Sequence, residues 1–421
     1  MSNNNQHKAG YKHTPLGWIP EEWEIKDLIN VASVKRGRFS PRPRNDPKFY
    51  GGNIPFVQTS DITNSNGKVN SFTQTLNAEG LKVSVLFPAG TILMTIASNV
   101  GHTAILELDM ACPDSLVGII CKDNIDNNYL NYFFSYNQKR IEYIAPGAQK
   151  NINIEFLEPL PIVYPEVKEQ LKIATILSTW DEAITKTQQL IAQLQQRNKG
   201  LMQQLLSGKK RLKGFANSEW KMIPLSSLFE RVKRTSPENI NNVEVLTISG
   251  RFGFLSQKEK FNRVIAGESL KNYTLLRRGE FSYNKGNSLA YQYGCVFKLD
   301  EYPEALVPNV YISFKPIAEI DTDYYAYYFK HDLLKPSLAK IISSGARMDG
   351  LLNVNAEDFF KIKVPVPSYK EQCLIGGILN NSHKELTLYK QKLLVLQQQK
   401  KGLMQKLLTG EVRVKFDNNQ N

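Results

Sequence analysis

A basic segment near the N-terminus contains the residues whose types and spacing most clearly suggest a chemical role. It has six cationic side chains and one acidic side chain, Asp46. The six are Lys35, Arg36, Arg38, Arg42, Arg44 and Lys48. Glycine and proline separate the charges, which predicts a loop. Closely spaced cations on a loop suit a phosphate backbone, because each phosphate they neutralise releases counterions. An ordinary basic surface loop is the alternative interpretation.

Polar side chains also follow several apolar runs, at positions where they would end strands. Amide, hydroxyl and cationic groups can bond base edges or phosphate oxygens, and an interleaved aromatic ring can contact them. In the first half of the chain the candidates are Gln58, Thr59, Ser98, Asn99, Gln149 and Lys150. In the second half they are Lys233, Arg234, Arg251, Lys285, Asn287, Ser288, Tyr291 and Arg347. These residue types predict a nucleic-acid-binding surface in each half.

The sequence contains no motif for catalysis on nucleic acids. It has neither a Gly-rich phosphate loop ending in Lys-Ser/Thr nor the Asn-Pro-Pro-Phe/Tyr motif of methyltransferases. Asp114 with Glu166 and Lys168 could be forced into a nuclease pattern, but Glu166 becomes Ser368 in the repeat described below. Four scattered cysteines and five dispersed histidines show no metal-ligand spacing. We therefore expect a chain that is not an enzyme and holds no metal or cofactor.

Length and charge agree with that expectation. A chain of 421 residues suggests two or three domains. Lys and Arg outnumber Asp and Glu by 53 to 40, and the net charge of +13 favours a polyanionic partner. The sequence shows no signal peptide or membrane span, and its cysteines are typical of reduced thiols. We expect a cytoplasmic protein with no membrane contact.

The chain contains an internal duplication. Residues 165–213 align without a gap to residues 367–415, with 22 identities in 49 positions, whereas chance would give about three. A weaker match relates Gly17–Trp23 to Gly214–Trp220. The two tryptophans, Trp23 and Trp220, are predicted to pack in cores. Each half is thus a variable region followed by a nearly constant one, which is typical of one scaffold carrying two binding surfaces.

The repeat predicts the domain boundaries. We expect an N-terminal tail at 1–17, a first variable domain at 18–164, a constant helix at 165–213, a second variable domain at 214–366, a second constant helix at 367–415 and a tail at 416–421. The variable domains contain short apolar runs between Gly, Pro and Asn turns, and helical patterns near 129–143 and 324–339. The predicted class is α+β.

Both constant segments have a heptad pattern. Prolines precede each segment, acidic Glu166 and Glu169 suit a first helical turn, and Gly208 and Gly410 suit C-terminal caps. The first seam is Ile173, Leu177, Trp180, Ile184, Thr187, Ile191, Leu194, Asn198, Leu201 and Leu205. The second is Ile375, Leu379, Ser382, Leu386, Tyr389, Leu393, Leu396, Lys400, Leu403 and Leu407. The pattern predicts two coiled-coil helices, each roughly 60 Å long at 1.5 Å per residue.

Two such helices in one chain most simply pair with each other, and an intervening domain that folds back makes the pair antiparallel, with approximate two-fold symmetry. Asn198 and Lys400 are expected to specify the register at some cost in stability. The alternative is that each helix packs only on its own domain. The repeated Lys-Gly-Leu-Met-Gln motif, Lys199–Gln203 and Lys401–Gln405, is a candidate docking surface.

This layout resembles the specificity subunit of type I restriction–modification systems. The most telling residues are Pro165–Gln170 with Lys199–Gly208, and Pro367–Gln372 with Lys401–Gly410. Residues 98–101 and 147–153 also resemble recurring elements of target-recognition domains, whereas Ser343–Arg347 is less typical.

The resemblance implies two target-recognition domains that read the two halves of a split site in double-stranded DNA. It also implies that the helices dock two methyltransferase subunits, which are joined by restriction–translocase subunits in host defence. S-adenosylmethionine, ATP and magnesium would then belong to the partners. Two alternatives remain: a self-contained nuclease or methyltransferase, and an interaction scaffold that does not bind DNA.

Overall fold

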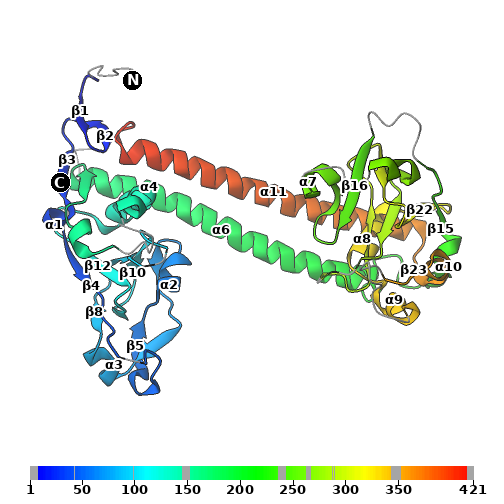
Figure 1. The fold of residues 1–421 in the computed structure, drawn as a ribbon, viewed down its shortest axis with the longest axis horizontal. Helices are drawn as coiled ribbons and strands as arrows, with labels where there is room; N and C mark the ends of the chain where they lie inside the picture. Colours follow the sequence, from blue (N-terminus) through cyan, green and yellow to red (C-terminus); the bar gives the residue numbers. More distant parts are fainter. Residues whose placement is uncertain are drawn as a thin grey trace. The chain divides into compact units, whose positions relative to one another are not determined.

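The computed structural model describes residues 8–41, 43–97, 99–144, 152–235, 243–261, 267–286, 288, 290–342 and 352–414. The chain forms two compact units (Figure 1). Unit 1 comprises residues 1–189 and 391–421, and unit 2 comprises residues 190–390. Each unit therefore contains one variable region and a segment from each constant helix. This division differs from the linear domains expected from the sequence, because the two helices pair within each unit.

Unit 1 contains two main sheets, which pack with short helices. The first sheet has the order β4-β12-β9-β10-β6 and the second β7-β5-β11-β8. The strands of the first are β4 (Ala32–Arg36), β12 (Leu116–Cys121), β9 (Ile92–Thr95), β10 (Thr103–Leu106) and β6 (Lys68–Val69). Those of the second are β7 (Gln74–Leu76), β5 (Tyr50–Phe56), β11 (Met110–Cys112) and β8 (Val85–Phe87). The strand pair β5–β11 is parallel, while β11–β8 and β5–β7 are antiparallel.

Shorter elements surround these sheets. They are β1 (Tyr11–Thr14), β2 (Gly17–Pro20), β3 (Glu24–Asp27), β13 (Pro161–Tyr164), α1 (Leu28–Val31), α2 (Thr59–Thr63), α3 (Ala78–Lys82), α4 (Asn127–Ile144), α5 (Ile154–Leu157) and the 3₁₀ turn η1 (Pro47–Phe49). Strand β1 pairs with β2, so residues 11–14 form a hairpin strand where the sequence suggested a tail. Strand β3 pairs with β13, which leads the chain to the start of the first long helix.

Unit 2 repeats the strand order. Its sheets are β15-β22-β19-β20 and β17-β16-β21-β18, and β14 pairs with β23. The strands are β14 (Lys221–Pro224), β15 (Phe229–Arg231), β16 (Glu244–Ser249), β17 (Gly253–Ser256), β18 (Thr274–Arg277), β19 (Phe281–Asn284), β20 (Cys295–Lys298), β21 (Glu304–Val307), β22 (Ile312–Pro316) and β23 (Lys363–Val366). The helices and 3₁₀ turns are η2 (Leu225–Ser227), α7 (Gln257–Phe261), η3 (Gly267–Asn272), α8 (Thr322–Lys330), α9 (Lys335–Ile341) and α10 (Ala356–Lys361).

Strand β16 in unit 2 corresponds to β5 in unit 1. It pairs parallel to β21 and antiparallel to β17, as β5 does to β11 and β7. The connection after the strand differs. In unit 1 it contains α2 and β6 before β7, whereas in unit 2 a tight turn joins β16 directly to β17. The two variable regions thus share a frame and differ in a segment that leaves it.

The long helices are α6 (Val167–Leu206) and α11 (Tyr369–Leu408). In unit 1 Asp181 contacts Lys400 and Glu169 contacts Arg413, and in unit 2 Asn198 contacts Ser382 and Arg211 contacts Glu371. In both units, residues later in the first constant segment contact residues earlier in the second constant segment. The helix segments within each unit therefore pair antiparallel (Figure 1).

The seam positions face this pairing. All twenty predicted seam residues are buried or half-buried, and Leu388, Leu394 and Val395, which lie off the seam of α11, are exposed. Gly208 and Gly410 adopt the left-handed backbone expected of C-terminal caps, with φ of 69° and 70°.

The helix ends are anchored in the cores of the variable regions. The core of unit 1 includes Ile173 and Leu177 from α6 together with Leu407 and Leu408 from α11. The core of unit 2 includes the last leucines of α6 and the first apolar residues of α11. Each helix thus packs on both a helix and a variable region, so pairing and packing on a domain are not alternatives.

One local expectation from the sequence is wrong. Lys35 and Arg36 lie in β4, which pairs with β12, and not in a loop, because Ala32 and Val34 of this strand pack in the core of unit 1. The helical pattern at 324–339 is confirmed as two helices, α8 and α9, which separate at Asp332, whose φ is 57°. Left-handed backbone at Asp332 ends the first helix.

Candidate nucleic-acid interface

A buried ion pair joins the start of α6 to the segment after α11 in unit 1. Glu169 is fully buried, and Arg413 donates from Nε and Nη2 to its two oxygens at 2.8 Å each. The guanidinium also bonds Glu22 and lies 5.9 Å from the Trp23 ring centre. Hydrogen bonding to Glu169 is the main cause that raises the pKa of Arg413, so the cation persists. A bidentate ion pair of this kind offsets the desolvation penalty of a carboxylate that is removed from water.

The same clamp recurs in unit 2. Glu371 is fully buried and accepts from Arg211 Nε and Nη2 at 2.9 and 2.8 Å. The indole Nε1 of Trp220 donates to Glu371 at 2.9 Å. Each Glu and each Arg occupies the same place in the duplicated segment, 202 residues apart. The prediction that the tryptophans pack in cores agrees with Trp23, which is buried, while Trp220 has this additional bonding role.

The glutamine beside each clamp ties the long helix to the variable region. Gln170 Nε2 donates to the carbonyls of Pro165 and Asn124, and its Oε1 accepts from the Asp126 amide. Gln372 does the same with the Pro367 carbonyl and the Asp321 amide. Asp126 and Asp321 each accept from a backbone amide in the first turn of α4 or α8. The repeat of Glu and Gln at 169–170 and 371–372 is therefore explained by their buried contacts, whereas the preceding Lys168 and Lys370 are exposed.

The polar seam residues differ between the units. In unit 1 Lys400 lies 2.5 Å from Asp181, and Asp181 also accepts from the Tyr132 hydroxyl at 2.7 Å. Burial, and then the nearby Asp181, raise the pKa of Tyr132, so its hydroxyl stays a donor. In unit 2 Asn198 Nδ2 donates to the Ser382 carbonyl at 2.9 Å. Both expected register residues thus have a partner on the opposite helix.

The basic segment of unit 1 makes protein contacts. Arg36 Nε donates to the Asp114 carbonyl at 2.8 Å, and Arg44 Nη2 bonds the Asp114 carboxylate at 2.8 and 2.9 Å. Arg38 donates to two carbonyls of residues 82 and 84. Lys48 pairs with Asp46 at 3.1 Å, and Lys35 is exposed on β4. These contacts hold the segment against the sheets while leaving the described cations at the surface.

The other candidates of unit 1 lie near the end of β5. Gln58 caps α2, and its side-chain amide donates to Gln74 at 3.2 Å. The Thr59 hydroxyl lies 3.2 Å from that of Ser115. Asn99 is exposed with a φ of 32°. Arg42, Ser98, Gln149 and Lys150 lie outside the described residues.

In unit 2 the candidates separate into buried and exposed groups. Arg234 pairs with Glu280 and donates to the Leu275 carbonyl, and the buried Tyr291 donates to the Lys330 carbonyl at 2.8 Å. Arg251 and Ser288 are exposed, and Ser288 lies against Gly250, which precedes Arg251 in the turn after β16. Lys233 is exposed after β15, and Lys285 is half-buried after β19. Asn287 and Arg347 lie outside the described residues.

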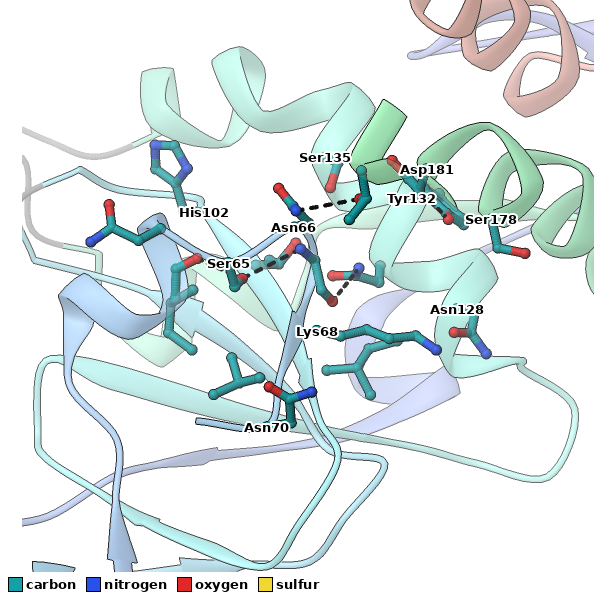
Figure 2. A pocket seen from close by; sticks show the side chains of 18 of the residues that line it. Ser65, Asn66, Lys68, Asn70, His102, Asn128, Tyr132, Ser135, Ser178 and Asp181 are labelled. Atoms are coloured by element: carbon teal, nitrogen blue, oxygen red, sulfur yellow. Dashed lines mark hydrogen bonds between the residues drawn. The ribbon is translucent and has the colours of Figure 1, made fainter. Parts of the chain in front are cut away.

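Two clefts lie where the variable regions meet the long helices. The cleft of unit 1 has a volume of about 870 Å³ and is lined by residues 61–71, by α4 and by α6 (Figure 2). The cleft of unit 2, about 360 Å³, is lined by the turn after β16, by α8 and by α11. Ser178 in the first cleft and Asn380 in the second occupy the same position of the duplicated segment. The sequence alone did not indicate these clefts, since their walls come from distant segments.

Within the described ranges, no group of three or more His, Cys, Asp or Glu side chains is placed to hold a metal ion. None of the described helices is long and apolar enough to span a membrane.

A family model described as the type I restriction modification DNA specificity domain matches residues 20–196 and again residues 217–398. The chain is 26% identical to the specificity subunit of the type I restriction enzyme MjaIX from Methanocaldococcus jannaschii, over 96% of each chain. It is 25% identical to the putative MjaX specificity subunit of the same organism, over 97% of this chain and 98% of that one.

Solved structures show the same fold. The type I specificity subunit from M. genitalium superposes with a TM-score of 0.56 at 18% identity, over 94% of this chain and 97% of that chain. The HsdS subunit from Thermoanaerobacter tengcongensis gives 0.51 at 16% identity, over 94% and 98%. The double match covers most of the chain and repeats as the duplication does. This chain belongs to the family of type I restriction–modification specificity subunits.

Proposed function

We propose that this chain reads a split site in double-stranded DNA, one half-site with each unit, and docks methyltransferase subunits onto its long helices. Restriction–translocase subunits join through those partners. The chain itself has no catalytic role and acts in the cytoplasm. S-adenosylmethionine, ATP and magnesium belong to the partner subunits.

The observation that carries this proposal is the repeated reader with its clamp. Both units place a sheet frame of the same order on antiparallel helix segments, held by Glu169–Arg413 or Glu371–Arg211. A frame that is repeated while its loops differ suits two different half-sites. The excess of 53 basic over 40 acidic residues favours a polyanion as the shared partner.

Docking on the helices is supported by their repeated exposed motif. Lys199 and Gln203 are exposed in unit 2, and Lys401 and Gln405 are exposed at the same repeat positions in unit 1. Because the same exposed motif occurs twice, it could bind two copies of the same partner. Leu394 and Val395 in unit 1 add exposed apolar area on α11, at 66% and 51% exposure.

The test is to purify the chain with its methyltransferase partner and select bound duplexes from a random-sequence library. We expect a motif with two specified blocks and an unspecified spacer. Enrichment of a single block or of none contradicts the proposal. The chain alone, supplied with S-adenosylmethionine or with ATP, magnesium and DNA, is expected to leave the DNA unmodified and uncut. Modification or cleavage by the chain alone would contradict the non-catalytic role.

A further inference from the structure

We propose that the two clefts are the base-reading sites of the two units, and that the segment closing each cleft selects the bases. In unit 1 this segment is residues 64–71, and in unit 2 it is residues 250–252. The inference rests on the proposed function and assigns its specificity to named residues. The candidate surface inferred from the sequence, the basic segment 35–48, then serves to hold phosphates.

The two clefts are formed by corresponding elements of the two units. Each is walled by the segment that follows the corresponding strand, β5 or β16, and by the corresponding helix, α4 or α8. Tyr132 and Tyr327 hold the same position in those two helices, and each donates to the long helix, to Asp181 at 2.7 Å and to Asn380 at 2.9 Å. The frame thus places two different closing segments at the same site of each unit.

This difference distinguishes DNA from a protein partner. A surface that docks two copies of one partner must be the same in both units, as the clamps and the Lys-Gly-Leu-Met-Gln motifs are. A surface that reads two different half-sites must instead differ. The closing segments differ in length, since residues 64–71 of unit 1 include β6 where unit 2 has only the turn 250–252, and they differ in chemistry.

The cleft of unit 1 is lined by amides and hydroxyls, and each of its three lysines pairs with a carboxylate. Three salt bridges are present: Lys400 with Asp181 at 2.5 Å, Lys186 with Glu182 at 3.3 Å and Lys68 with Glu107 at 3.8 Å. The uncharged lining includes Ser65, Asn66, Asn70, Asn128, Ser135 and Ser178 (Figure 2). Asn66 and Asn70 are exposed on the closing segment. Asparagine can donate to and accept from an adenine edge at once, which makes this lining suited to bases.

The cleft of unit 2 is closed by an arginine and an exposed aromatic ring. Phe252 is 65% exposed, and the Arg251 guanidinium lies 5.1 Å from its ring centre. The turn is closely packed at Gly250, where an added Cβ would meet the Ser288 hydroxyl at 2.9 Å, and Gly253 has a φ of 76°. A turn presenting Phe beside Arg suits contact between a base step and a phosphate or guanine.

The experiment uses the full chain bound to its methyltransferase partner and the library selection described above. The variants are Phe252→Ala and Phe252→Leu in unit 2, and Asn66→Ala with Asn70→Ala in unit 1. We expect Phe252→Ala to relax one block of the motif only and the asparagine changes to relax the other only. Binding to the selected duplex should weaken roughly 5- to 100-fold per altered contact. Phe252→Leu should retain part of the preference, since leucine is also found as a wedge.

Matched controls are Met222→Ala, an apolar residue of unit 2 that is 57% exposed on β14, and Asn30→Ala, an exposed asparagine of unit 1. Both should leave the motif unchanged. The inference is overturned if both blocks persist in the variants, if both relax together, or if Phe252→Ala releases the methyltransferase instead, which would make the turn a protein contact. If the wild-type complex itself selects no two-block motif, the proposed function fails as well as this assignment.

The folding of each variant is checked separately. Unfolding midpoints equal to that of the wild type exclude loss of the fold. If Phe252→Ala is unstable, the motif selected by Phe252→Leu tests the inference instead.

Discussion

Units 1 and 2 are built on the same frame but complete their shared polar positions differently. In unit 1 the clamp carboxylate Glu169 bonds Arg413, whose guanidinium also reaches Glu22. In unit 2 the equivalent Glu371 bonds both Arg211 and the Trp220 indole. The residues that hold the helices together are of the same type in both units, whereas the residues that close the clefts differ in type. Duplication therefore kept the scaffold interactions, while the residues that face the clefts diverged.

Breaking the two clamps should give the largest effects, and unequal ones. Arg413→Ala leaves the fully buried Glu169 without its ion partner, which should lower the free energy of unfolding by about 3 kcal/mol or more. Arg211→Ala should cost less, because Trp220 still donates to Glu371. Urea unfolding of the full chain measures both, with Lys401→Ala as an exposed control. Equal losses would show that the indole hydrogen bond contributes nothing, and no loss would refute the clamp.

The basic segment should affect DNA affinity and its salt dependence. Changing Arg36, Arg38, Arg42 and Arg44 together to alanine should weaken binding and flatten the dependence of log K on log salt, by about 0.9 for each phosphate that is no longer neutralised. The readout is binding of the assembled complex between 50 and 200 mM salt, a range in which phosphate neutralisation strongly affects affinity.

Two further sets of variants separate the effect of charge from that of local contacts and test the second unit. Asp114→Ala removes the partner of Arg44 but no cation, and it should leave the slope unchanged or steeper. Replacing exposed Arg231 and Lys233, which end and follow β15 in unit 2, tests whether the second unit holds phosphates in the same place. An unchanged slope in the fourfold variant would exclude the segment of unit 1 as a phosphate-binding surface.

The polar seam residues should have smaller effects on stability. Asn198→Ala removes a buried hydrogen bond to the Ser382 carbonyl and should cost about 1 to 2 kcal/mol. Lys400→Ala and Asp181→Ala should be coupled by about 1 kcal/mol, since the two side chains are in direct contact. A double-mutant cycle measures this coupling. Additive losses from Lys400→Ala and Asp181→Ala would mean that the ion pair does not specify the register.

The smallest effect concerns pH. His383 replaces Asp181 at the same position of the duplicated helix, and burial, followed by the nearby Lys330 and Lys390, lowers its pKa below 6.5. The unfolded chain then binds the proton first, so stability should fall as pH decreases from about 6.5 towards the folded-state pKa. His383→Gln should reduce this slope slightly. His331, whose pKa burial also lowers, provides the comparison: His331→Gln should reduce it as well. A slope unaffected by both changes contradicts this assignment.

Regular patterns made much of the architecture predictable. The duplication, the α+β class, the seams and the capping glycines Gly208 and Gly410 depend on spacing along the chain, which heptad periodicity and backbone conformation reveal directly. The strand at Lys35 and Arg36 is not predicted, because adjacent charges followed by Gly37 resemble a loop when their partner strand is unknown. The division at Asp332 was missed because the apolar pattern continues across the break.

The functional candidates were less predictable, because a side chain's partners are set by distant segments. Arg234 and Tyr291 read as exposed polar candidates, yet their partners Glu280 and the Lys330 carbonyl hold them in the framework. Phe252 carried no signal in the sequence, because an apolar residue in a strand-rich region reads as core.

The duplication, the helical nature of the constant segments and the divergence of the two variable regions are all written in the amino-acid order. They follow from local periodicity and from aligning the chain with itself. The pairing of Glu169 with Arg413 and of Glu371 with Arg211 becomes visible only in the folded chain, where each helix joins the core of the other half's unit. The positions of the clefts are known only from the folded chain as well. Burial pairs charges and assembles cleft walls across some 160 to 240 residues of separation, which no local pattern records.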